Sequence, residues 1–273
     1  MKIAIIGAGI SGLLAAKALH DLGISNWVIY DRAPEHAGKT LGLHFLHDNC
    51  GLPLKPSSVH NLVLNSDPSI EPNILYAQKT GVPEHNSVKN LRAYQTVYDM
   101  VEAHRLLTRW FGHRIERKEF KDSSDVVVLA HSYDYVISTI PRHFVQRSIK
   151  CNFTIAGVKL NTVPGDVFAL VSILPQSNLV VYNVNPDNDW YRFSNVFGQT
   201  SLEMKRSLAS DPALIEIRKV VTTDATGDVL NKHVIFQGRW GKWRRGVLAH
   251  ETYYETFGQF KEHSTKTFWI TKG

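Results

Sequence analysis

Apolar residues recur along the chain in two patterns, short continuous runs and helical spacing. The run Ile3–Ile6 is rich in β-branched residues and predicts a strand buried on both faces. Residues 13–19 are strong helix formers and predict a helix that ends near Gly23. A second apolar run at Trp27–Tyr30 predicts another buried strand. Further strands are expected at Ile74–Gln78, Ile115–Lys121, Asp125–Ala130, Tyr133–Ile140, Val167–Leu174, Leu179–Val184 and His233–Arg239, and further helices at Leu91–Phe111 and Val247–Phe260.

A glycine-rich turn stands between the first strand and the first helix. Gly7, Gly9 and Gly12 fit the spacing G-x-G-x-x-G, with Ser11 inside the turn, and Asp31 ends the second strand. In this arrangement the first glycine permits a tight turn, the second lets the backbone approach a pyrophosphate, and the third lets helix and strand pack closely. The helix N-terminus offers N–H groups to phosphates, and the acid can accept hydrogen bonds from a ribose diol. Because all these parts occur in the required order, the sequence predicts a dinucleotide-binding site.

Two other interpretations of this stretch fit it less well. A signal peptide would need an apolar segment without three interrupting glycines and a polar cleavage region after it. An ordinary βαβ unit would need neither the glycine spacing nor the acid. Arg32 suggests the 2′-phosphate of NADP, but Asp31 beside it would repel that phosphate.

The segment after Asp31 resembles the extended fingerprint of the flavoprotein group that includes amine oxidases and UDP-galactopyranose mutases. Gly38 and Lys39 stand where this group has two adjacent glycines, so one of the two is kept. The resemblance implies that the segment continues along FAD, with Arg32 and Lys39 among the cofactor-binding residues. FAD is therefore the expected cofactor.

The stretch Gly42–Gly51 resembles the part of the mutases in which a glycine and histidines pass close to the flavin. The resemblance makes His44 and His47 catalytic candidates, for a hydrogen bond to the ring or for proton transfer to substrate. Structural packing and a metal pair at positions i and i+3 are the alternatives. The sequence shows no further cluster of metal-ligating residues that could complete a site with this pair, so no metal site is expected.

Two later segments resemble the parts of the same group that return to the cofactor. A buried strand ending in Ser-Thr-Ile-Pro makes Thr139 and Pro141 candidates for cofactor contact at the carboxyl edge of the sheet. A later strand ends in Gly238, which would permit close backbone approach, and Arg239, which would contact a cofactor phosphate. Val247 begins the predicted helix whose N-terminus would face the flavin.

Residues 145–232 resemble a separate insert with mainly antiparallel strands. Its run Asp189–Ser194 resembles the substrate sheet of the mutases and amine oxidases, in which an aromatic-arginine run faces the flavin. Arg192 is the catalytic candidate that would clamp an anionic group, with Trp190 or Tyr182 as a stacking wall. A plain role in sheet packing is the alternative for each of these residues.

Composition narrows the class of protein. The chain has 273 residues, of which 43% are hydrophobic and 21% are charged, and this composition is typical of soluble globular proteins. No apolar run is long enough to cross a bilayer. The two cysteines lie far apart, which favours a reducing compartment, so a cytoplasmic location without membrane contact is expected. The net charge is +6, and basic clusters at Arg105–Lys121 and Arg239–Arg245 suggest contact with DNA. A solvated helix face is the alternative for the first cluster.

These features predict an α/β fold, with a doubly wound Rossmann-type FAD-binding domain (residues 1–50, 112–144 and 233–273) and a smaller β-rich substrate domain (51–111 and 145–232). The leading function is an amine-oxidase-like, FAD-dependent oxidoreductase that oxidises a C–N bond of an amine or amino-acid-like substrate. That substrate is a small molecule or an amino-acid-modified base carried on DNA, as for phage DNA-modification flavoenzymes. The alternatives are a UDP-galactopyranose mutase-like isomerase of sugar nucleotides that uses reduced FAD, and a non-catalytic dinucleotide-binding module. The oligomeric state is left open.

Overall fold

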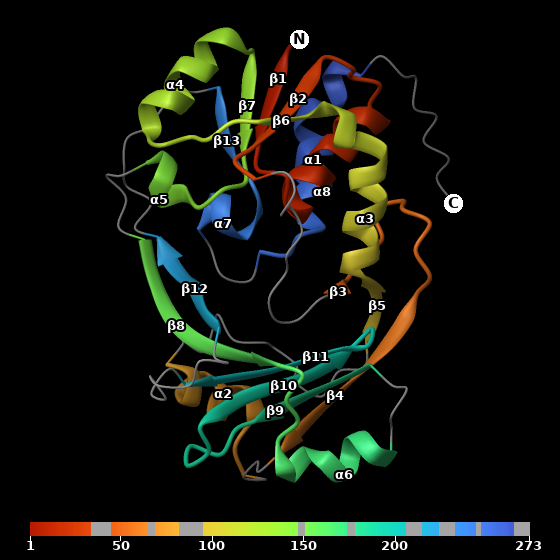
Figure 1. The fold of residues 1–273 in the computed structure, drawn as a ribbon, viewed down its shortest axis with the longest axis vertical. Coiled ribbons are helices and arrows are strands. Elements are labelled where there is room, and N and C mark those ends of the chain that lie inside the picture. Colours follow the sequence, from red (N-terminus) through yellow and green to blue (C-terminus); the bar gives the residue numbers. More distant parts are fainter. Residues whose placement is uncertain are drawn as a thin grey trace.

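Two β-sheets organise the computed structural model of the chain (Figure 1). A five-stranded parallel sheet with its helices forms one half, and an eight-stranded curled sheet forms the other. The carboxyl ends of the parallel strands point toward the curled sheet (Figure 1). The structure describes residues 1–33, 45–64, 69–81, 95–146, 151–173, 178–205, 215–223, 233–243 and 247–264.

The parallel sheet has the strand order β13-β7-β1-β2-β6. Its centre is β1 (Ile3–Ile6), whose four residues are all buried, as the apolar run predicts. β1 pairs in parallel with β2 and with β7, so both of its edges are covered. The other strands are β2 (Trp27–Asp31), β6 (Ile115–Arg117), β7 (Tyr135–Ser138) and β13 (Val234–Phe236).

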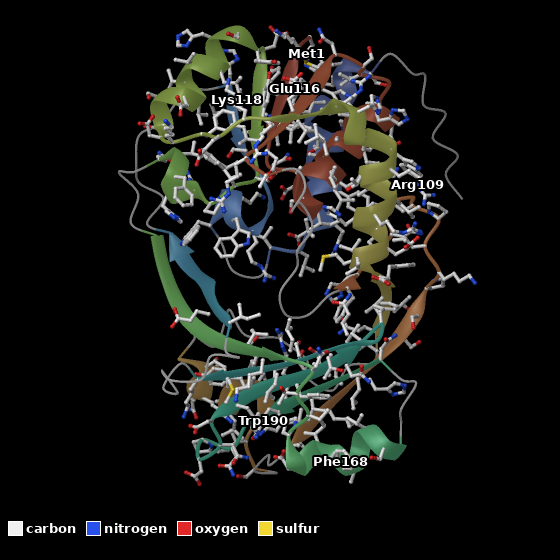
Figure 2. The ribbon with its side chains drawn as sticks, viewed as in Figure 1. Met1, Arg109, Glu116, Lys118, Phe168 and Trp190 are labelled. Carbon is white, nitrogen blue, oxygen red and sulfur yellow. The ribbon has the colours of Figure 1, made fainter. Side chains whose placement is uncertain are left out.

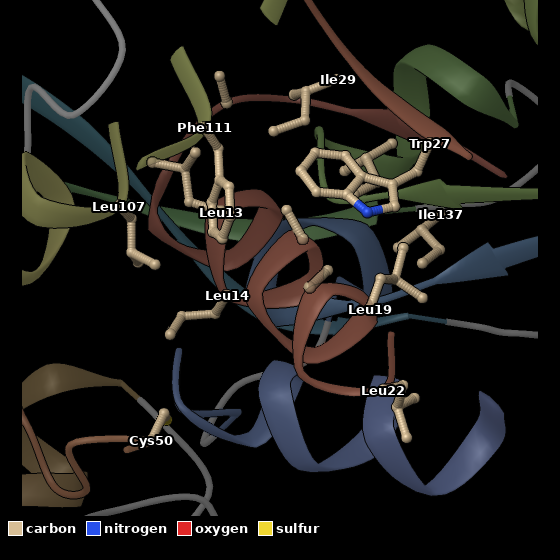
Figure 3. Packing of buried hydrophobic residues seen from close by; sticks show 14 of the residues in the cluster. Leu13, Leu14, Leu19, Leu22, Trp27, Ile29, Cys50, Leu107, Phe111 and Ile137 are labelled. Atoms are coloured by element: carbon tan, nitrogen blue, oxygen red, sulfur yellow. The ribbon is translucent and has the colours of Figure 1, made fainter. Parts of the chain in front are cut away.

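Helices cover both faces of this sheet. On one face α1 (Ile10–Asp21), α3 (Met100–Phe111) and α8 (Glu251–Phe260) share a buried core with the sheet. This core includes Leu13 and Leu19 of α1 together with Trp27, Ile29 and Phe111, which are labelled in Figure 3. On the other face α4 (Ser123–Ser132) and α5 (Arg142–Val145) pack on Ala4, Ile6 and Val136. Each fully buried leucine contributes roughly 1.5–3 kcal/mol, so the helix faces hold the layers together. The expected mixed α/β architecture is confirmed.

The curled sheet has the order β12-β8-β11-β10-β9-β4-β5-β3. Its neighbouring strands are antiparallel except for the parallel pair β4 and β9. Phe197 and Gly198 join β10 to β11 with φ of 50° and 76°, the two positive values that a type I′ hairpin turn requires. The strands are β3 (Phe45–Leu46), β4 (Ser57–Leu64), β5 (Gln95–Asp99), β8 (Cys151–Leu160), β9 (Asn178–Asn183), β10 (Trp190–Val196), β11 (Gln199–Lys205) and β12 (Ile215–Thr223).

Three segments predicted as strands are helices. Residues 74–78 lie in α2 (Pro72–Thr80), which begins with proline at its first position and ends at Gly81, with a left-handed φ of 65°. Residues 125–130 lie in α4, where the Asp122 carboxylate accepts from the Ser124 N–H. Residues 167–174 largely lie in α6 (Gly165–Ile173). Residues that favour strands misled the prediction, and packing of the helices outweighs that preference, with local caps at α2 and α4.

Helix boundaries also differ from the predictions. The helix predicted over 91–111 begins at Met100, because Asp99 accepts from the N–H groups of Val101 and Glu102 and so caps it. Residues 95–99 form β5 instead, and 91–94 lie outside the described residues. The helix predicted from Val247 begins at Glu251. The predicted strand at 115–121 is confirmed at the edge of the parallel sheet but ends at Arg117.

Two elements pack across the predicted domain boundaries. α3 packs on α1 through Ala103, Leu107 and Phe111, so it belongs with the parallel sheet. β3 lies within residues 1–50 yet pairs with β5 in the curled sheet. The remaining domain division stays a prediction. Among the described residues, no helix combines the length and the apolar character that crossing a membrane requires.

Two glycines provide a matched test of this packing. α7 (Gly238–Lys242) lies on the end of β7, and a methyl group on Gly241 would come 2.4 Å from the Ser138 carbonyl oxygen. A methyl group on Gly258, inside α8, would meet nothing within 4 Å. We expect Gly258→Ala to raise the free energy of unfolding by about 0.5–1 kcal/mol and Gly241→Ala to lower it by about 1–3 kcal/mol. Urea unfolding measures both, and equal values for the two variants would contradict the packing of α7 on β7.

Candidate functional site

The glycine-rich turn joins β1 to α1 at the carboxyl edge of the parallel sheet. Gly7 has a φ of +100°, which favours glycine, and a methyl there would lie 2.7 Å from Thr139 Oγ1. A methyl on Gly12 would lie 1.8 Å from the Gly7 carbonyl oxygen. The first and third glycines of the motif are therefore required by the fold itself.

Gly9 differs from these two glycines. Its φ of −68° and ψ of 175° are open to any residue, and a methyl on it would meet nothing within 4 Å. Neither the backbone nor the packing of the protein requires glycine here. The absent side chain instead leaves space beside the first turn of α1, where a ligand can approach the backbone.

Hydrogen bonds hold the turn from several sides. The Gly7 N–H donates to the Tyr30 carbonyl at 2.8 Å, and the Ala8 N–H donates to the Asp31 carboxylate at 2.7 Å. The second oxygen of Asp31 accepts from the Ala33 N–H at 2.9 Å. Thr139 Oγ1 donates to the Ile6 carbonyl at 2.9 Å. Asp31 and Thr139 therefore shape the turn, a role that the sequence did not predict for them.

A buried histidine completes this support. His104 of α3 is 8% exposed, and its Nε2 lies 3.2 Å from the Ala8 carbonyl oxygen. Burial lowers the pKa of His104, and the bond to Ala8 opposes that shift. From the sequence, position 104 is expected only to lie in a helix. Helical spacing placed His104 on the buried face, but it gave no sign of the distant carbonyl that the ring contacts.

Two helix N-termini meet beside the turn. A methyl on Gly238, which has a φ of +70°, would lie 2.7 Å from Ser11 Oγ in α1 and 3.6 Å from Thr252 Oγ1 in α8. At their other ends the two helices are also close, since Ser264 Oγ donates to the Leu22 carbonyl at 2.9 Å. α1 and α8 therefore run side by side in the same direction. No side chain caps α1, so its positive dipole end favours an anion at this edge. The first N–H groups of α8 already donate to the carbonyls of Leu248, Ala249 and His250, and Glu251 places a negative charge in its first turn.

Two buried hydroxyls lie at the same edge. Ser138 and Thr252 are fully buried, and their side-chain oxygens have no hydrogen-bond partner among the described residues. Thr252 belongs to the first turn of α8 and was not predicted as a site residue. Buried hydroxyls normally have partners, so these two groups add polar capacity beside the turn.

A pair of histidines lies where β3 approaches α8. The rings of His47 and His250 are 5.9 Å apart, and the His250 Nδ1 is buried with no partner among the described residues. Partial burial lowers the pKa of His47, and His250 lowers it further, whereas Gln95 and Glu251 raise it. His250 was missed because it belonged to a predicted helix far along the chain. Neither ring has a role that the structure assigns.

Arg192 of β10 lies in an ion pair. Its guanidinium lies 3.0 Å from the Glu203 carboxylate, which is itself buried, on the adjacent strand β11. Burial would lower the pKa of Arg192, but Glu203 and Tyr182 raise it. The arginine therefore belongs to an ion pair within the curled sheet, which balances its charge, and its role as a clamp for an anion stays a prediction.

The other predicted cofactor residues lie in varied positions. Pro141 is the residue before α5, Arg32 is exposed after β2, and Arg239 Nε donates to the Val247 carbonyl at 3.3 Å. Arg239 thus holds the segment that leads into α8, and its contact with a phosphate stays a prediction. Lys39 and His44 lie outside the described residues. Among the residues that are described, no three His, Cys, Asp or Glu side chains are grouped so that they could hold a metal ion.

The predicted basic cluster at residues 105–121 is spread over several surfaces. Arg105 pairs with Glu102 at 2.6 Å, and Arg114 lies over the Trp27 ring. Lys118 lies over the Tyr30 ring, 5.1 Å from its centre. Figure 2 shows Arg109 and Lys118 on separate parts of the parallel-sheet half. Several of these side chains thus have partners in the protein, and contact with DNA stays a prediction.

The chain is similar in fold to a solved mutase structure. No protein-family model and no curated protein matches the chain. A crystal structure of reduced UDP-galactopyranose mutase is similar over 97% of this chain and 96% of its own, with a TM-score of 0.55 and 15% sequence identity. A provisionally assigned FAD-containing monooxygenase from Photorhabdus luminescens subsp. laumondii aligns over 99% of this chain and 91% of its own, with a TM-score of 0.45 and 12% identity. The first likeness shows that the chain has the overall fold of that mutase structure, and the second is below the level that establishes a common fold.

Cys50 provides a test of the packing beside α8. Its thiol is 1% exposed and lies 3.8 Å from the His250 carbonyl oxygen. Burial, aided by the Asp48 charge, raises the pKa of Cys50 to about 12, so the thiol stays protonated at neutral pH. In a Cys151→Ser background we expect a thiol reagent at pH 8 to label Cys50 at least about a hundredfold more slowly in the folded protein than in urea. Equal labelling rates would contradict a buried Cys50 at this position.

Proposed function

We propose that this chain is a flavoenzyme that binds FAD across the turn from Gly7 to Gly12 and oxidises a C–N bond of an amine or amino-acid-like substrate. Gly9 is the observation that carries the cofactor assignment. It is a glycine that neither backbone strain nor packing requires, at the N-terminus of a helix that no side chain caps. A pyrophosphate that approaches the backbone closely accounts for both features.

The residues around the turn fit a dinucleotide. The anionic pyrophosphate would lie against the N–H groups of the first turn of α1. Asp31 uses one lone pair on each carboxylate oxygen for Ala8 and Ala33, so it retains acceptors for a ribose hydroxyl. In this proposal the parallel sheet with its helices is a doubly wound FAD-binding domain, and the curled sheet carries the substrate.

FAD is favoured over NADP by the charge of Asp31 and by the likeness in fold. A 2′-phosphate beside the Asp31 carboxylate would be repelled. The similar structure is that of a reduced mutase, which agrees with a redox-active group in this fold. The partial resemblance of the segment after Asp31 to flavoproteins supports the same choice.

In amine oxidation the protein would position the substrate against the flavin and surround it with groups whose charges are balanced. When bound, FAD supplies the acceptor for the hydride that leaves the carbon beside nitrogen, and water hydrolyses the resulting imine. The charges of Arg192 and Glu203 balance each other within the curled sheet. These features suit a substrate without the strong negative charge of a sugar nucleotide. We keep an amine on a DNA base among the substrates to test, and a cytoplasmic location remains part of this proposal.

A mutase-like isomerase is the second candidate. The observation in its favour is the similarity to the mutase structure over nearly the full length of both chains. Such an enzyme would act on a sugar nucleotide with reduced FAD and without net oxidation. A module that binds FAD and catalyses nothing is the third possibility.

The test begins with the visible spectrum of the protein after reconstitution with FAD and removal of free cofactor. We expect a yellow protein, bleached anaerobically by an amine substrate and recoloured by an electron acceptor, because the hydride is transferred to the flavin. Primary and secondary amines, amino acids and amine-modified DNA form the substrate panel.

The same preparation separates the alternatives. An isomerase would interconvert UDP-galactopyranose and its furanose form only after chemical reduction, with no acceptor consumed. A yellow protein inert to both panels would contradict the proposed oxidation but not FAD binding. A protein that stays colourless after reconstitution would overturn the flavoenzyme proposal as a whole.

A further inference from the structure

His104 links a helix of the parallel-sheet half to the second residue of the glycine-rich turn. Its Nε2 lies 3.2 Å from the Ala8 carbonyl oxygen, and its Nδ1 lies 3.4 Å from Thr108 Oγ1, one turn along α3. A carbonyl oxygen only accepts hydrogen bonds, so the proton of the neutral ring must be on Nε2. The Thr108 hydroxyl can then donate to Nδ1, which leaves both ring nitrogens satisfied.

The direction of the Ala8 carbonyl sets the direction of the next N–H. In a planar trans peptide the C=O of one residue and the N–H of the following residue point opposite ways. His104 holds the Ala8 carbonyl toward α3, so the Gly9 N–H points away from α3. The preceding peptide is held as well, because the Ala8 N–H donates to Asp31 at 2.7 Å. Two consecutive peptide planes are thus fixed just before the open space beside Gly9.

We propose that His104 is a positioning residue for the cofactor: by donating to the Ala8 carbonyl it turns the Gly9 N–H toward the pyrophosphate and keeps the carbonyl lone pairs away from that anion. This inference rests on the proposed function, since it names FAD as the ligand of the turn. His104 itself touches no cofactor atom in this account. Its effect passes through the Ala8–Gly9 peptide.

The helix that carries His104 also continues directly from a strand of the curled sheet. Asp99 is both the last residue of β5 and the cap of α3, so the strand leads into the helix without a loop. β5 pairs with β4 and β3 in the curled sheet, and its Gln95 hydrogen-bonds His47. One continuous strand and helix therefore contact both the curled sheet and the cofactor turn.

The test compares three variants of the whole chain in the apo form. His104→Leu removes the donor but keeps an apolar side chain, and His104→Gln restores an N–H at about the same reach. Leu107→Val trims the same helix, one turn from the contact, and serves as the control for loss of stability. The Kd for FAD is measured by quenching of flavin fluorescence, and unfolding in urea is measured for each variant.

We expect His104→Leu to raise the Kd for FAD about tenfold, the effect of losing one hydrogen bond that orients a ligand-binding N–H. His104→Gln should bind FAD within about threefold of the wild type, and Leu107→Val should bind FAD as the wild type does even where it unfolds earlier.

Three results would overturn the inference. The first is wild-type affinity for FAD in His104→Leu. The second is equal loss of affinity in His104→Leu and His104→Gln, which would mean that the shape of the ring matters and its donor does not. The third is a loss of affinity for FAD in Leu107→Val that is proportional to the loss of stability of that variant. If the wild type itself binds no FAD, the proposed function fails, and that outcome is seen before any variant is compared.

Discussion

The close approach of α1 to the Gly7 carbonyl is the constraint on which the candidate site depends. With 1.8 Å between that oxygen and a methyl on Gly12, only glycine lets the helix begin directly after β1. The turn is then short enough for Ala8 to be held on both sides, by Asp31 through its N–H and by His104 through its carbonyl. Thr139, directly after β7, donates to the Ile6 carbonyl at the start of the turn. The peptide groups beside Gly9 are therefore positioned before any ligand arrives, which lowers the entropy cost of binding.

The supports of this turn come from separate parts of the chain. Asp31 ends the strand beside β1, Thr139 follows β7, and His104 belongs to a helix that continues from the curled sheet. α8 begins at the same edge, with Thr252 near Gly238. Parallel strands bring their carboxyl ends to one edge, so residues distant in sequence meet there. This is why the edge can hold an extended ligand such as a dinucleotide.

The sequence predicted correctly those elements that depend on residues close together in the chain. The apolar runs of β1 and β2, the glycine spacing and the following acid identified the strand-turn-helix unit, and the structure has it. Strand and helix were confused at residues 74–78 and 125–130, because valine, isoleucine and tyrosine favour strands while the caps at Asp122 and Gly81 decide for helices. Arg192 was predicted as a free cation because Glu203, its partner, is opposite it only once β10 and β11 pair. His104 and His250 were missed for the same reason, since their contacts join residues far apart in the chain.

We infer that position 9 is glycine because a bound ligand needs the space of its side chain, since the fold itself does not require glycine there. The variant Gly9→Ser tests this most directly. Serine is a favourable helix N-cap and its side chain has room in the free protein. The account predicts that the apo variant unfolds at the same urea concentration as the wild type or at a higher one, while its Kd for FAD rises at least about tenfold because the side chain occupies the place of the pyrophosphate. Unchanged affinity for FAD in a stable Gly9→Ser protein would contradict the account.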